Sequence, residues 1–80
     1  MPDADQRLRL WQGMFASSRL LAADTDLAKL AESYELSGGA ITNAVRYAAI
    51  QAIRMKRDVI IQDDLIKGVI KELLKEGRTL

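Results

Sequence analysis

The sequence predicts an all-α fold, a small four-helix bundle, and three observations support that prediction. Apolar residues recur at helical spacing in four separate segments. The single proline stands at position 2, so little interrupts the later helices, and Ser37-Gly38-Gly39 is the clearest break between them. The chain of 80 residues fits one small domain, residues 1–80, and leaves no room for two.

The first helix is expected over about residues 3–16. Pro2 suits a first helical turn, and the helix dipole favours the acidic residues Asp3 and Asp5 near that end. The apolar stripe of this helix consists of Leu8, Trp11, Met14 and Phe15, broadened by Leu10.

A second, shorter helix is expected over about residues 26–35. Asp24, Thr25 and Asp26 are each suitable N-caps, and the sequence does not choose between them. One face of this helix carries Leu27, Leu30, Ala31 and Tyr34.

The third helix is expected over about residues 39–55, with Ser37 as a natural N-cap. Ile50 and Ile53 extend its apolar surface sideways. The inner stripe is expected to consist of Ile41, Ala44, Val45, Ala48, Ala52 and Met55.

The fourth helix is expected over about residues 62–76, and Gly77 is its expected stop. Its apolar residues are Leu65, Ile66, Val69, Ile70, Leu73 and Leu74. From the four stripes together we expect one core that contains Trp11, Leu30, Val45, Ala48, Leu65 and Val69.

Composition excludes several classes of function. The chain has no Cys and no His, which removes thiol nucleophiles, imidazole bases and ordinary zinc sites. The net charge is +1, with 12 basic and 11 acidic residues interleaved, so a nucleic-acid partner is not expected. No apolar run approaches the roughly 20 residues that cross a bilayer. We therefore expect a cytoplasmic protein without a membrane partner.

Four short motifs stand in order along the chain: Pro2 to Leu8, Asp26 to Ala31, Leu36 to Ile41, and Ile61 to Leu65. They comprise a Pro-acidic helix start, an acidic residue followed by Leu and Leu-Ala, an apolar-Ser-Gly turn, and an apolar-x-x-acidic-Leu segment. In this order and spacing they resemble the C-terminal helical lid, or small subdomain, of AAA ATPases. Each motif alone is weak, but together they extend over nearly the whole chain.

The resemblance implies a part of a larger ATPase whose sequence continues upstream of Met1. A lid of this kind closes over ATP or ADP bound mainly by the large subdomain of the same chain, where magnesium is also held. It senses the nucleotide and contacts neighbouring protomers of a homo-oligomeric ring. This chain lacks a phosphate loop and a strand that ends in paired carboxylates, so we expect no enzyme activity from it alone and an ATPase as its parent.

The chain departs from the family pattern at three places. Glu35 stands where many members carry a helix-stopping glycine, and a positive φ there would cost on the order of 1 kcal/mol. Ala40 stands where an acidic residue is common. No arginine follows the glycines directly, so the sensor-two arginine of other branches has no counterpart, and Arg46 is a weak substitute.

Gly38 and Gly39 are the best candidates for a functional site. By resemblance this turn faces the adenine and ribose of the nucleotide, because small residues let the backbone approach closely. The alternative is that the two glycines only form a tight turn before a helix. Asn43, one turn further on, is a candidate to reach the nucleotide or the large subdomain, or is instead a solvated or loop-capping residue.

Two other groups of residues have structural interpretations that we prefer. Trp11 and Phe15 share a helical face and could stack on a base, but a lone Trp at that spacing favours the core. The arginines could contact phosphate or another protomer, but a solvated face is the default, with Arg46 and Arg54 able to line one broad side. These arginines are Arg7, Arg9, Arg19, Arg46, Arg54 and Arg57.

Two alternatives to the lid remain open from the sequence. One is a free-standing helical protein-interaction or DNA-binding module, although the Ala-rich third helix lacks a cluster of base-facing polar residues. The other is a dimerisation domain of histone-like type, which would expose a large apolar face when monomeric.

Overall fold

The computed structural model describes residues 2–15 and 21–77. Within them the chain forms four helices and no strand: α1 (Ala4–Phe15), α2 (Leu27–Ser33), α3 (Gly38–Arg54) and α4 (Gln62–Lys75). The all-α prediction is confirmed, and the predicted helix boundaries agree with these to within two residues. The expected end of the first helix at residue 16 lies outside the described residues.

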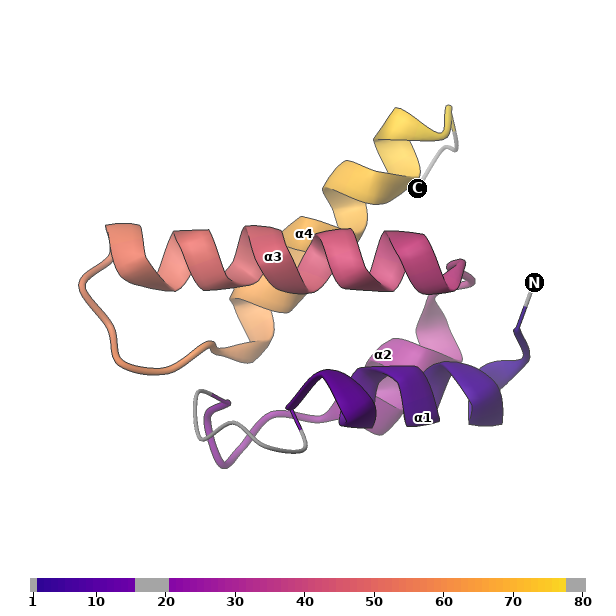
Figure 1. The fold of residues 1–80 in the computed structure, drawn as a ribbon, viewed down its shortest axis with the longest axis horizontal. Coiled ribbons are helices and arrows are strands. Elements are labelled where there is room, and N and C mark those ends of the chain that lie inside the picture. The colour runs from indigo at the N-terminus through magenta and orange to yellow at the C-terminus, as the bar shows by residue number, and fades with distance from the viewer. Residues whose placement is uncertain (1, 16–20, 78–80) are drawn as a thin grey trace.

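The four helices pack as two pairs. The long helix α3 packs most extensively against α4, which crosses it at an angle, and α1 packs against α2 (Figure 1). Helix α1 also contacts α3, and it runs along the side of α3 that is remote from the C-terminal end of α4. Among the described residues, a backbone bridge joins Leu21, which precedes α2, to Ile60, which precedes α4.

One core lies between the helix pairs. All six residues expected there are buried, and Trp11, Ala48, Leu65 and Val69 have no exposed surface. Leu36 and Ile60 are buried as well, although they stand in connecting segments where helical periodicity gives no signal. The buried apolar residues are Trp11, Leu30, Ala31, Leu36, Ala40, Ile41, Ala44, Val45, Ala48, Ala52, Ile60, Leu65, Val69 and Leu73.

Four residues that were expected in apolar stripes are exposed. Met55 is 60% exposed because α3 ends at Arg54 and the backbone turns away, with Lys56 in the left-handed region at φ 57°. Leu74 is exposed because it lies about 180° around α4 from Leu65, at roughly 100° per residue. The expectations for Met14 and Leu10 on α1 were also wrong, since both side chains are more than a third exposed.

Side chains and glycine define the helix ends as the sequence indicates. Asp26 is the N-cap of α2, and its carboxylate accepts a hydrogen bond from the Lys29 N–H at 3.0 Å. The Ser37 hydroxyl accepts one from the Ala40 N–H at 3.1 Å and caps α3. Gly77 follows α4 with φ 76°, the conformation that favours glycine after a helix.

Arg7 is buried, so the default expectation of a solvated arginine was wrong at this position. Its Nε donates to the Ala31 carbonyl at 2.7 Å, and its Nη1 donates to the Pro2 carbonyl at 2.7 Å. The carbonyls at the end of α2 lack helical partners, and a guanidinium with several fixed donors satisfies such groups well. Arg7 therefore ties α1 to the end of α2.

Arg57 and Asp64 form an ion pair where the chain enters α4. Two guanidinium nitrogens of Arg57 lie 2.7 and 2.9 Å from the two carboxylate oxygens of Asp64, which is almost fully buried. The carboxylate also accepts from the Ile61 N–H at 3.1 Å, which is half of a capping box. The hydrogen bonds from Arg57 lower the pKa of Asp64 below its usual value, and this pair likewise raises the pKa of Arg57.

The lowered pKa of Asp64 predicts a loss of stability in acid. Because the folded-state pKa lies below the unfolded value of about 4, the stabilisation is complete above that value and is lost as the pH falls through the folded-state pKa. Asp64→Asn should be less stable than the parent near neutral pH and should lose less stability between about pH 5 and about pH 2. Urea denaturation across this range measures both effects.

Asp63→Asn is the matched control for this experiment. Asp63 lies beside Asp64 and pairs with Lys67 at 3.0 Å, but both partners are largely exposed. Such a surface pair contributes little to stability. If the parent and Asp64→Asn lost equal stability in acid, the Arg57–Asp64 pair would not be the cause of the loss.

Candidate functional site

The turn that begins α3 is held in place from both sides. Leu36 is fully buried just before it, Ser37 caps the helix, and Gly38 and Gly39 are its first two residues. The Thr42 hydroxyl donates to the Gly38 carbonyl at 3.0 Å. The chain therefore presents a fixed helix N-terminus, with Gly39 exposed to solvent and Gly38 half-buried.

Two backbone donors at this turn are left over. The N–H groups of Ala40 and Ile41 donate to the side chain and the carbonyl of Ser37. The N–H groups of Gly38 and Gly39 have no acceptor among the described residues. Free N–H groups at a helix N-terminus attract acceptors and negative charge. The turn therefore presents backbone donors of the kind that bind such groups.

Neither glycine is required by the conformation of the turn. Among the described glycines only Gly77 has a positive φ. A Cβ built at Gly38 would meet Leu10 Cδ1 at 3.8 Å, and one built at Gly39 would meet only Ser37 Oγ at 4.0 Å. Both distances are ordinary van der Waals contacts. Neither position therefore requires glycine for its backbone conformation or to admit a Cβ, and the choice between a turn alone and a nucleotide contact stays open.

Asn43 connects α3 to α4. Its Nδ2 donates to Glu72 Oε1 at 3.1 Å, and Glu72 is buried and lies 3.7 Å from the Lys75 ammonium group. Sequence reasoning did not identify Glu72, because the two residues are 29 positions apart and no local pattern joins them. A contact of Asn43 with a nucleotide or with a large subdomain stays a prediction.

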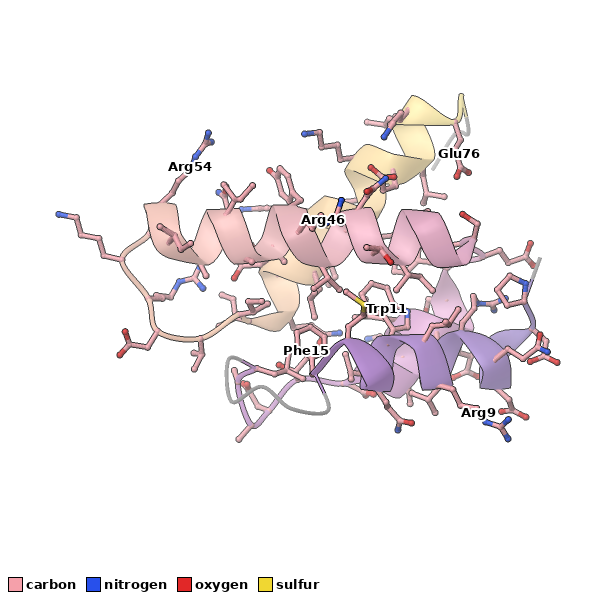
Figure 2. All side chains as sticks on the ribbon, in the orientation of Figure 1. Arg9, Trp11, Phe15, Arg46, Arg54 and Glu76 are labelled. Atoms are coloured by element: carbon pink, nitrogen blue, oxygen red, sulfur yellow. The ribbon has the colours of Figure 1, made fainter. Side chains whose placement is uncertain are left out.

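The aromatic pair on α1 belongs to the core (Figure 2). Trp11 has no exposed surface, so its indole is covered and offers no stacking face, and Phe15 is half-buried and packs against the core. The Trp11 Nε1 is buried without an acceptor among the described residues. The preference for a core role is confirmed for both residues.

The other candidates divide between surface and structural positions. Arg46 and Arg54 are both exposed on α3, which agrees with the expectation that they line one broad side of this helix. Arg9 is exposed on α1 (Figure 2). Arg19 lies outside the described residues. Glu35 does not have a positive φ, because the chain leaves α2 through the extended Tyr34, so the strain considered there does not arise.

The described residues show neither a metal-binding cluster nor a membrane-spanning helix. Residues 2–15 and 21–77 contain no group of three or more Asp and Glu side chains arranged to hold a metal ion. Within the same ranges no helix is both long and apolar enough to span a bilayer.

Comparison with known proteins gives two relatives that are similar over nearly the whole chain. No protein-family model matches. The chain is 37% identical over 76 residues to "ATP-dependent zinc metalloprotease FTSH 12, chloroplastic" from Arabidopsis thaliana, covering 94% of the chain and 7% of that protein. It is 34% identical over 77 residues to "Proteasome-activating nucleotidase" from Methanopyrus kandleri, covering 95% of the chain and 17% of that protein.

Both relatives are AAA ATPases, so the resemblance drawn from the four motifs is confirmed. The all-α four-helix fold is of the type found in the lids of these ATPases. The chain spans less than a fifth of the length of either relative.

Proposed function

Because the chain is related to AAA ATPases over nearly its whole length, we propose that it is the nucleotide-sensing lid of such an enzyme. In this role it closes over ATP or ADP held by the large subdomain of the same longer chain. It passes the nucleotide state to neighbouring protomers of a homo-oligomeric ring. We place the phosphate loop and magnesium in the large subdomain and the protein in the cytoplasm, and the four helices alone form one lid domain.

The glycine turn is the observation that carries this proposal. Among the described residues the N–H groups of Gly38 and Gly39 have no acceptor, and the atom nearest to a Cβ built at Gly39 is Ser37 Oγ at 4.0 Å. A lid can sense a nucleotide only if its contacts differ between the nucleotide-bound and empty states. Direct contact of this turn with the nucleotide would provide such a difference. We propose Asn43, one turn later, as a second contact, beside its hydrogen bond to Glu72.

The fold is suited to transmit that signal as one body. A single core joins all four helices, Arg7 ties α1 to α2, and Asn43 with Glu72 ties α3 to α4. Movement at the glycine turn would therefore move the whole lid. No residue of the chain takes a catalytic role in this proposal, so the chain alone is not an enzyme.

Gly39 provides the test in the longer ATPase. Gly39→Ala should bind ATP normally, because its Cβ would have no contact closer than 4.0 Å. Gly39→Leu should lower ATP affinity by about tenfold or more, corresponding to about 1.4 kcal/mol, because the longer side chain fills the space left for the nucleotide. A fluorescent ATP analogue titrated into both variants measures the affinity.

Two controls separate binding from folding. Gly39→Leu in the 80-residue chain should keep its helicity in circular dichroism, because the position is exposed. The 80-residue chain should also release no phosphate from ATP. Normal ATP binding by Gly39→Leu in the longer protein would mean that the glycine turn only begins α3 and does not contact the nucleotide.

A further inference from the structure

Helix α3 carries an outward surface that combines exposed aliphatic and basic side chains. Ile50 is 53% exposed and Ile53 is 73% exposed, and Arg46 and Arg54 are exposed beside them. At roughly 100° per residue these four residues lie within an arc of about 100°. We call them the outer face of α3. Figure 2 shows Arg54 pointing away from the α1 side of the bundle.

The charge of the outer face has one sign. The 17 residues of α3 include two arginines and no acidic residue. Lys56 follows the helix, and Arg57 is already paired with Asp64. The exposed Asp58, in the following loop, is the acidic residue nearest in sequence. The outer face is therefore cationic at both ends and aliphatic in the middle.

A surface hollow adjoins this face. It has a volume of about 170 Å³ and is bounded by Ala49 and Ile53 on α3 and by Val59 and Ile60 in the loop before α4. Its lining is almost entirely apolar, and Asp58 is the one acidic residue that borders it. A cavity of about 150 Å³ accepts a molecule the size of benzene, so this hollow accepts one aliphatic or aromatic side chain.

We propose that the outer face of α3 binds an amphipathic helical segment of a partner protein, in which acidic residues flank aliphatic ones. Arg46 and Arg54 are separated by about 12 Å along the helix axis at 1.5 Å per residue. Two carboxylates with the same separation can face both arginines, while an aliphatic side chain between them packs on Ile50 and Ile53 or fills the hollow. This binding goes beyond the proposed nucleotide contact and does not depend on it.

The charges argue against two other occupants. A second copy of the chain pairing through the same face would place Arg46 opposite Arg54 or opposite its own equivalent, and like charges repel in both arrangements. An anionic bilayer would attract the arginines, but it has no single side chain that fills the hollow. An amphipathic helix whose apolar side chains recur at helical spacing fits both the arginine pair and the apolar hollow.

The experiment uses the 80-residue chain labelled with ¹⁵N and three synthetic helical peptides. The first peptide carries two Glu at the separation of Arg46 and Arg54 with Leu between them, the second has Lys for Glu, and the third has Ser for Leu. The first should shift the amide signals of the outer face. The second and third should bind at least tenfold more weakly.

Variants of the chain test which residues of the outer face bind the peptide. The double variant Arg46→Glu, Arg54→Glu should prefer the Lys peptide, and Ile53→Ser should weaken binding of the Glu peptide. Arg9→Glu, an exposed arginine on α1, is the matched control and should leave the preference unchanged. All these positions are exposed, so circular dichroism should show an unchanged fold.

Four results would overturn the proposal: equal binding of the Glu and Lys peptides, amide shifts confined to other helices, dimerisation through α3 in sedimentation, or binding to phosphatidylserine vesicles without binding to the peptide. None of these results bears on the Gly39 test, because that test measures ATP affinity in the longer protein. Failure of one proposal therefore leaves the other standing.

Discussion

Val45→Asp is expected to unfold the protein. Val45 is 8% exposed in the middle of α3 and belongs to the one core. A carboxylate there would lose its hydration among apolar side chains without gaining a partner, at a cost of several kcal/mol. A domain of this size has a total stability of only about 4–12 kcal/mol. Far-UV circular dichroism during heating should show a large loss of helix or a strongly lowered melting temperature.

Ile50→Asp is the matched control for that experiment. It introduces the same charge into the same helix and removes a larger side chain, but Ile50 is 53% exposed. Substitutions at such surface positions usually change the free energy of unfolding by no more than about 0.5 kcal/mol. Similar melting curves for the two variants would show that the buried and exposed faces of α3 are not distinct.

Helical periodicity was sufficient to predict the buried face of α3. Ala44, Val45 and Ala48 recur at the spacing of one helical face, and all three are buried. The same reasoning failed for Met55, because periodicity continues past the point where the chain leaves the helix. The exit depends on Lys56 in a left-handed conformation, which a lysine rarely adopts and no local pattern indicated.

The polar contacts between helices were not predictable from the sequence. Arg7 binds a carbonyl 24 positions away, and Asn43 binds a carboxylate 29 positions away. A stripe of apolar residues defines which face of a helix is buried, but it does not define where two helices cross or which polar groups meet there. Arg7 was assigned to the surface for that reason.

At the candidate site, too, local sequence predicted some features and tertiary packing determined others. The apolar-Ser-Gly motif placed the turn at Ser37, Gly38 and Gly39, and the serine cap follows from the ordinary preference for Ser at that position. The space beside the turn depends on Leu10, which approaches Gly38 from a different helix. That contact is a result of tertiary packing, so the motif located the turn without showing that its backbone is accessible.

Gly68 is the residue whose importance the sequence concealed most completely. It lies in the interior of α4, where glycine is unfavourable, and is buried at the crossing with α3. A Cβ added there would lie 2.6 Å from the Ala44 carbonyl oxygen and 3.1 Å from the Ala44 Cα. Those are backbone atoms of α3, and they can move only if the two helices separate.

Gly68→Ala is therefore expected to destabilise the protein by about 2–3 kcal/mol, as overpacking does. This net loss should appear although alanine favours a helix over glycine by about 1 kcal/mol. Gly13→Ala is the matched control, because Gly13 is exposed in α1 and an added Cβ there meets nothing within 4 Å. It should stabilise the protein by about 0.5–1 kcal/mol.

Urea denaturation of the two variants gives a difference that depends on packing alone, because both replace glycine by alanine in a helix. The expected changes have opposite signs, so the helix preference of alanine cannot account for both. A Gly68→Ala variant as stable as Gly13→Ala would mean that α3 and α4 separate at little cost. With the expected signs, the close approach at Ala44 explains why the fold has a glycine in the middle of its last helix.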